Sequence, residues 1–266
     1  MYSYQHRYHA GNKADLHKHL VLLAVLQTLQ KKEKPFSVLD AFAGEGIYDL
    51  SSLESQKNKE YLDGFDKIKQ ITNAPYLVQE LNKIIQQYQT TDQTLIYPGS
   101  PAIICSQLRK QDQAVFIENH PQAYIQLKKN FFKKSQLHVH KRDGFEAINA
   151  LVPFPKARGL IFIDPSYEVK EEYKIISSTI QKVYVKFSQG IYLVWYPLLP
   201  EARHKELTWE LNNYFVNNTW QHEWQFPLNN SKGLCGSGII IINPPWKFES
   251  IIQESLQFLS TITHQY

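Results

Sequence analysis

The chain has 266 residues, of which 43% are hydrophobic and 20% charged, so it can bury a full core. This composition excludes a disordered or fibrous protein. The 29 Lys and Arg residues against 25 Asp and Glu residues give a net charge of +4, which permits a polyanionic partner without requiring one.

Cysteine content and hydropathy indicate the compartment. Cys105 and Cys235 lie far apart and neither has a CxxC partner, so neither a zinc site nor a disulfide framework is indicated. The N-terminal residues are polar and cationic, and the apolar stretch at 20–26 is too short to cross a bilayer. We therefore expect a soluble cytoplasmic protein without a membrane partner.

Histidines, tyrosines and cations are concentrated at the N-terminus. Aromatic rings interleaved with cations suit unstacked RNA bases and phosphates. The alternative is a histidine metal site, but no cysteine or clustered carboxylate completes a ligand set, so we expect no metal. The residues concerned are Tyr2, Tyr4, His6, Arg7, Tyr8, His9, Lys13, His17, Lys18 and His19.

The first predicted elements are a helix and a strand. Apolar residues recur at three- and four-residue steps over 16–29, which predicts an amphipathic helix with Asp15 near its start. Residues 36–40 read as a short buried strand. The loop at 41–46 contains two glycines, which would let backbone N–H groups approach a ligand.

Further apolar runs predict strands separated by helices, at 114–118, 137–140, 159–164 and 190–196. Strands that alternate with helices favour an α/β protein with a mostly parallel, doubly wound sheet. A last run at 238–243 precedes a helix-like segment that reaches about residue 263, and we expect this run to close an edge of the sheet.

One spacing indicates an insertion. In nucleotide-binding βαβ units the acid that binds the ribose lies about 20 residues beyond the glycine loop. Here the first strand-end acid after Asp40 is Glu118, 78 residues further on. Residues 51–97 are polar and have helical periodicity around 76–88, so we expect a small inserted helical subdomain. Ser100 is the predicted cap of the helix that follows.

Three strand ends carry candidate cofactor contacts. Asp40 and the glycine loop could hold the amino acid end of a cofactor, although such a loop can also be a plain tight turn. Glu118 could accept hydrogen bonds from a ribose diol, or be a solvated loop acid. Asp143 and Gly144 could meet an adenine amino group, and Asp143 could at the same time cap a helix.

The segment Asp164-Pro165-Ser166-Tyr167 carries the predicted chemistry. An adenine amino nitrogen is a poor nucleophile, because its lone pair is delocalised into the ring. The Asp164 carboxylate and the Pro165 carbonyl can accept its two hydrogens, and Tyr167 can stack on an extruded base. The alternative is a plain Asp-Pro turn after a strand.

Asn243-Pro244-Pro245-Trp246 matches an amino-methyltransferase motif more literally. The candidate cofactor contacts, however, precede Asp164 in the order of successive strands, which places Asp164 beside the first strand where the sheet order reverses. We therefore interpret the Asn243 segment as structural.

Five segments together resemble the large-subunit ribosomal RNA methyltransferase J family, and the resemblance covers essentially the whole chain. It implies one domain, 1–266, with a Rossmann-like S-adenosylmethionine-dependent methyltransferase fold, a mostly parallel seven-stranded sheet and the inserted subdomain. It also implies a monomer without an obligate protein partner that makes N6-methyladenine at one adenine of 23S ribosomal RNA. The segments are 4–19, 97–101, 164–167, 190–197 and 242–247.

The resemblance also implies roles for individual residues. Asp164 would be the proton acceptor, and Tyr4 and Lys18 would contact the RNA. Two positions depart from the family pattern. The family has histidine where this chain has Phe42, and a second proline where this chain has Ser166; Phe42 can still flank the cofactor. Expected contacts to S-adenosyl-L-methionine are His19, Phe42, Ser100, Glu118, Asp143, Gly144 and Asp164.

The expected reaction is a direct in-line methyl transfer to the adenine N6, with a proton leaving towards Asp164. Two alternatives stay open: a DNA adenine-N6 methyltransferase, and a non-catalytic protein with a vestigial pocket that acts in the use of external DNA. A nicotinamide enzyme is disfavoured, because the loop lacks the third glycine of that fingerprint.

Overall fold

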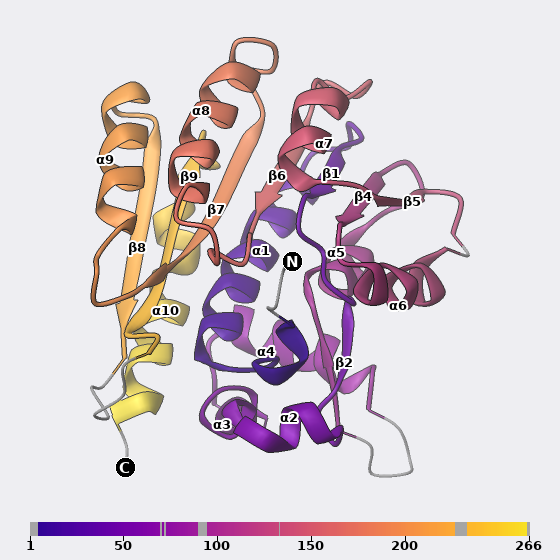
Figure 1. Cartoon of the computed structure of the whole chain (residues 1–266), viewed down its shortest axis with the longest axis vertical. Coiled ribbons are helices and arrows are strands. Elements are labelled where there is room, and N and C mark those ends of the chain that lie inside the picture. The colour runs from indigo at the N-terminus through magenta and orange to yellow at the C-terminus, as the bar shows by residue number, and fades with distance from the viewer. Residues whose placement is uncertain are drawn as a thin grey trace.

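A seven-stranded sheet forms the centre of the computed structural model (Figure 1), which describes residues 5–69, 71, 73–89, 95–132, 134–226 and 233–264. Across the sheet the strands are β5 (Leu137–Lys141), β4 (Gln113–Glu118), β1 (Ser37–Asp40), β6 (Gly159–Ile163), β7 (Ile191–Leu198), β9 (Gly236–Ile242) and β8 (Thr219–Gln225).

Five of these strands are parallel, from β5 to β7, while β9 is antiparallel to both β7 and β8. The predicted α/β, mostly parallel Rossmann-like methyltransferase fold is thus confirmed. The prediction that the last apolar run closes an edge is wrong, because β9 lies between two strands. The edge strand is β8, which sequence reasoning missed, although its alternating Trp220, His222 and Trp224 carry a strand signal.

Helices cover both faces of the sheet. Figure 1 shows α7 (Gly144–Leu151), α8 (Glu172–Tyr184) and α9 (His204–Tyr214) in a row along one face. The other face packs against α1 (Lys13–Gln30), α5 (Ser100–Gln107), α6 (Pro121–Phe131) and α10 (Phe248–His264). Successive residues of β6 enter opposite cores, with Leu160 and Phe162 in one and Ile161 and Ile163 in the other.

Helix α1 differs from its predicted amphipathic form. Asn12 caps it by accepting a hydrogen bond from the Asp15 backbone N–H at 2.9 Å. Every residue from 14 to 26 is buried, polar ones included. The helix lacks a solvent face there because it packs against α4, α5, α10 and β9.

The described residues between β1 and α5 form four short helices and a two-stranded sheet that was not predicted, in which β2 (Ile47–Asp49) pairs antiparallel with β3 (Ile96–Pro98). The helices are α2 (Leu53–Asn58), η2 (Glu60–Asp63), α3 (Phe65–Ile68) and α4 (Tyr76–Gln86). Helix α4 packs on α1 and α10. That residues 51–97 form a subdomain within one domain stays a prediction.

Within the described ranges, the structure contains no helix long and apolar enough to span a membrane.

The burial of α1 makes a stability prediction. Leu22 is fully buried, so Leu22→Ala should lower the free energy of unfolding by about 2 to 5 kcal/mol through lost transfer free energy and a cavity. Leu53 on α2 is 89% exposed, and Leu53→Ala should change the free energy of unfolding by less than about 0.5 kcal/mol. Denaturant unfolding of both variants measures the difference. Equal effects would contradict the central position of α1.

Candidate functional site

A cavity lies at the carboxyl edge of the parallel strands, where the strand order reverses between β1 and β6. In open α/β sheets this is the usual ligand site, because the connections leave the two strands in opposite directions. Of the predicted site residues, those that line it are Lys18, His19, Phe42, Ser100, Glu118, Asp143, Gly144, Asp164 and Pro165. Tyr4 lies outside the described residues.

The glycine loop after β1 holds Glu118 in place. The Gly44 N–H donates to Glu118 Oε2 at 2.9 Å, and the His120 N–H donates to Oε1 at 2.6 Å. Gly44 has φ +60°, and a Cβ there would meet the Tyr48 hydroxyl at 2.2 Å. Burial raises the pKa of Glu118, and the two amides oppose this effect. The loop thus presents a carboxylate of fixed orientation to the cavity.

Two aromatic rings form an apolar part of the cavity wall. The Phe42 and Phe145 rings meet edge to face at 5.1 Å. A Cβ at Gly144 would lie 2.4 Å from the Ala41 carbonyl and 2.6 Å from the Phe42 ring, so only glycine fits there. Asp143 caps α7 by accepting a hydrogen bond from the Glu146 N–H at 2.9 Å, as the sequence suggested.

Asp40 is fully buried and does not line the described cavity. Its Oδ2 accepts a hydrogen bond from the Ser100 Oγ at 2.7 Å, so Ser100 is positioned by Asp40 and is the first residue of α5 rather than its cap, which is Gly99. The expectation that the Asp40 carboxylate itself reaches a cofactor is not supported by this burial.

His19 also has a buried partner, the Tyr97 hydroxyl, which lies 2.8 Å from its Nδ1. Burial lowers the pKa of His19 to about 3, so the ring is neutral near pH 7.

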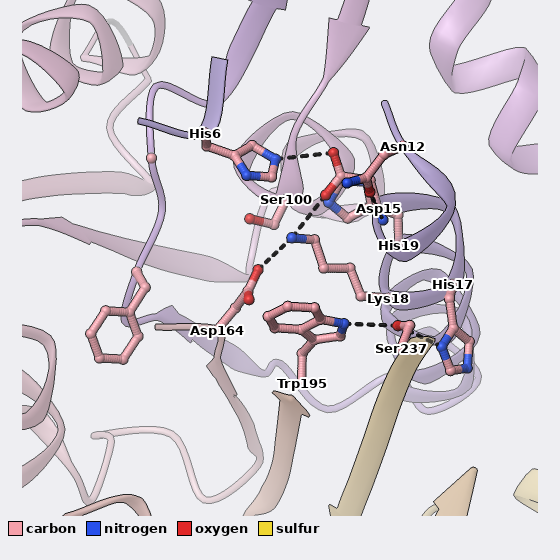
Figure 2. Close-up of polar contacts among 12 residues, drawn as sticks. His6, Asn12, Asp15, His17, Lys18, His19, Ser100, Asp164, Trp195 and Ser237 are labelled. Atoms are coloured by element: carbon pink, nitrogen blue, oxygen red, sulfur yellow. Dashed lines mark hydrogen bonds and ion pairs between the residues drawn. The ribbon is translucent and has the colours of Figure 1, made fainter. Parts of the chain in front are cut away.

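A chain of charged groups joins the N-terminal segment to the end of β6 (Figure 2). Lys18 Nζ lies 2.7 Å from Asp164 Oδ2 and 2.8 Å from Asp15 Oδ1. Asp15 Oδ2 accepts a hydrogen bond from the Gly11 N–H and lies 3.0 Å from His6 Nε2. Burial alone would raise the pKa of Asp15, but His6 and Lys18 hold it well below its usual range.

Sequence reasoning gave Lys18 only a contact with RNA and Asp15 only a place at a helix start. The structure makes both of them supports of Asp164. It also adds His6 and Arg7, from the short helix η1 (His6–Tyr8), to the cavity wall. The histidine-rich opening block was the signal for these residues, but their partners are distant in sequence.

Arg7 and His9 of the opening block are paired with carboxylates within the protein. Arg7 donates to Glu45 at 2.8 Å and to Glu54 at 2.9 Å, and His9 Nδ1 lies 2.7 Å from Glu60 Oε1. Their charges hold the N-terminal segment against the loop after β1 and against the helices that follow it.

Tyr167 differs from its predicted position. Its side chain is only 9% exposed, its hydroxyl donates to the Trp195 carbonyl at 2.5 Å, and its ring packs against Tyr173 at 4.6 Å. It is therefore absent from the lining of the described cavity. The prediction that its ring faces a bound base is not met in this conformation, since these contacts turn the ring into the core.

Asn243 lies at the opposite edge of the sheet. Strand β9 is antiparallel, so its end is paired with the beginning of β7. Asn243 Nδ2 donates to the carbonyls of Ser188 and Gly190 at 2.7 and 2.6 Å. Both the position and these bonds support the structural interpretation of the Asn243 segment.

The buried Asp40 makes a pH prediction. Burial raises the pKa of Asp40 from 3.8 to about 7. The folded protein therefore loses stability as the pH rises from about 4 to about 7, because the buried carboxyl must ionise, and this loss persists at higher pH. Asp40→Asn should therefore have a higher melting temperature than wild type at about pH 8 and lose this advantage near pH 4. The difference in the free energy of unfolding between the two proteins should change by at most about 1.4 kcal/mol per pH unit. The exposed Asp63→Asn is the control for lost charge. A difference independent of pH would contradict the shift.

Comparisons with known proteins agree with this architecture. The family model "Ribosomal RNA large subunit methyltransferase D, RlmJ" matches residues 33–265. The chain is 38% identical over 260 residues to ribosomal RNA large subunit methyltransferase J of Escherichia coli K12, covering 97% of this chain and 93% of that protein. The Haemophilus influenzae protein of the same name is 36% identical over 262 residues, covering 98% and 93%.

A solved structure is similar over nearly the whole fold. The crystal structure of protein LPL1258 from Legionella pneumophila has a TM-score of 0.89 and 39% identity, and the match covers 96% of this chain and 94% of that one. The match of the family model and the full-length relatives confirm the resemblance found in the sequence: this chain belongs to the RlmJ family of ribosomal RNA large subunit methyltransferases.

Proposed function

We propose that this protein uses S-adenosyl-L-methionine to make N6-methyladenine at one adenine of 23S ribosomal RNA. Membership of the family and the names of its relatives support the class of reaction and the RNA substrate. The observation that carries the choice of adenine N6 is the Asp164-Pro165 segment on the cavity wall, directly after β6.

The residues of the cavity fit the proposed cofactor. Glu118 presents a carboxylate, held by two backbone amides, that can accept hydrogen bonds from a ribose diol. Phe42 and Gly144 give the cavity an apolar wall suited to an adenine ring, and Asp143 lines the same cavity. His19 and Ser100 line the same cavity. When bound, S-adenosyl-L-methionine supplies an electrophilic methyl group on a sulfonium.

The role of Asp164 follows from its support. Lys18 holds one carboxylate oxygen, which restricts rotation of the side chain, and the proline ring restricts the backbone that carries the neighbouring carbonyl. The Asp164 carboxylate and the Pro165 carbonyl can accept the two hydrogens of an adenine amine and so present its lone pair for in-line attack. With the cofactor bound, transfer of its methyl group from sulfur to the amine nitrogen would leave an excess proton on that nitrogen, which Asp164 would accept.

Tyr167 has a supporting part in this proposal. Because its hydroxyl is bonded to the Trp195 carbonyl, it anchors the far end of the Asp164 segment. Ser166, at the position where the family has a second proline, lines the cavity between these two fixed points, so the segment keeps its restraint at both ends. We further propose that the protein acts as a monomer without an obligate protein partner.

The role of Asp164 can be tested by substitution. Asp164→Asn removes the proton acceptor while it keeps the shape of the side chain, so methyl transfer to undermethylated 23S RNA should fall by about 10²- to 10⁴-fold. Transfer from radiolabelled cofactor, followed by nucleoside mass spectrometry, measures both rate and product. Thermal melting and binding of S-adenosylhomocysteine report whether fold and cofactor site persist.

The exposed Asp63→Asn serves as the matched control and should keep wild-type turnover. Wild-type turnover in Asp164→Asn would defeat the assignment. Matched DNA tested beside the RNA separates the alternatives: methylation of DNA alone would make this a DNA enzyme, and transfer to neither polymer would favour a non-catalytic protein.

A further inference from the structure

We propose that Trp195 is a positioning residue for the methyl transfer, because it contacts both Lys18 and Tyr167 and so restrains both ends of the Asp164 segment. This inference rests on the proposed function and adds a residue from β7 to it. In the register of β6 and β7, Ile163 is the partner of Val194, so Trp195 lies one residue beyond the pairing, level with Asp164.

The first contact is with the ring. Lys18 Nζ lies 5.2 Å from the centroid of the Trp195 ring while it bonds Asp15 and Asp164. Figure 2 shows the ring beside the Lys18 side chain, below the ion pair with Asp164. A cation over an indole face is attracted by the ring quadrupole. The ring therefore restrains the ammonium on a side that the two carboxylates do not cover.

The second contact uses the backbone. The Trp195 carbonyl accepts the hydrogen bond from the Tyr167 hydroxyl, and the two rings meet edge to face at 5.9 Å. Tyr167 has φ +55°, an uncommon conformation for a non-glycine residue, and these contacts hold it. One residue thus sets the place of Lys18 and of Tyr167, between which the Asp164 carboxylate and the Pro165 carbonyl must stay aligned.

The indole orientation is itself fixed by a buried network. Trp195 Nε1 donates to Ser237 Oγ at 2.8 Å, and Ser237 Oγ lies 2.8 Å from His17 Nδ1. His17 Nε2 lies 3.0 Å from His222 Nδ1. Trp195 is a donor in this network, and a neutral His17 can bond both Ser237 and His222 because one of its ring nitrogens donates and the other accepts. Burial lowers the pKa of His17 well below its usual range, which keeps this ring neutral.

Two substitutions at Trp195 test the inference. Trp195→Leu removes the aromatic face, so kcat should fall by about 10²-fold, the usual effect of a small misplacement of reacting groups. Trp195→Phe keeps an aromatic face and loses the indole N–H, so kcat should fall by about fivefold only. The KM and Kd for the cofactor should not change, since Trp195 is not among the described residues that line the cavity.

Trp209→Leu is the matched control, because it makes the same change of side chain on α9, outside the network that orients Trp195. Trp209 is 68% exposed, so the variant should keep both its stability and its kcat.

The outcomes separate the two proposals. A wild-type kcat in Trp195→Leu, or a loss of kcat no greater than in Trp209→Leu at equal folded fraction, would overturn the positioning role alone. An inactive wild-type protein would overturn the proposed function, and the role of Trp195 with it.

Discussion

The structure of the site depends on one ammonium group, that of Lys18, held between Asp15 and Asp164. Helix α1 supplies Asp15 and Lys18 one turn apart, and Asp164 directly follows β6. A buried charge needs partners of opposite sign, because removing an unpaired charge from water costs on the order of several kcal/mol. The ion pairs therefore tie α1 to the end of β6 and define the cavity between them.

This constraint explains why a buried helix carries several polar side chains. Asp15, His17, Lys18 and His19 are all buried on α1, and each has a polar partner from another part of the chain. Two of these partners are Tyr97, on β3, and Ser237, on β9. The same helix thus joins the core to the insert and to the sheet, and any shift of it would displace Asp164.

The sheet has a complementary part, because it brings strand ends to one edge. Glu118, Asp143 and Asp164 follow successive parallel strands, so their meeting could be predicted from the spacing of apolar runs alone. The role of Asp143 as a helix cap could be predicted as well, since capping is local. Contacts between distant segments could not: the alternating strand β8 was missed, and Tyr167 turned into the core against Trp195.

By itself, the sequence determined the fold class, the order of the five parallel strands along the chain and the acids at the ends of four of them, because periodicity and turn residues act over short distances. Only the tertiary structure decided which of these groups meet. In the structure, the predicted amphipathic helix is buried on all sides over residues 14–26, and Lys18 forms ion pairs with two carboxylates. Because β9 is antiparallel, Asn243 lies at the edge of the sheet opposite to the cavity. Such contacts depend on packing between segments more than a hundred residues apart, as between Lys18 and Asp164, 146 residues apart, which no local pattern encodes.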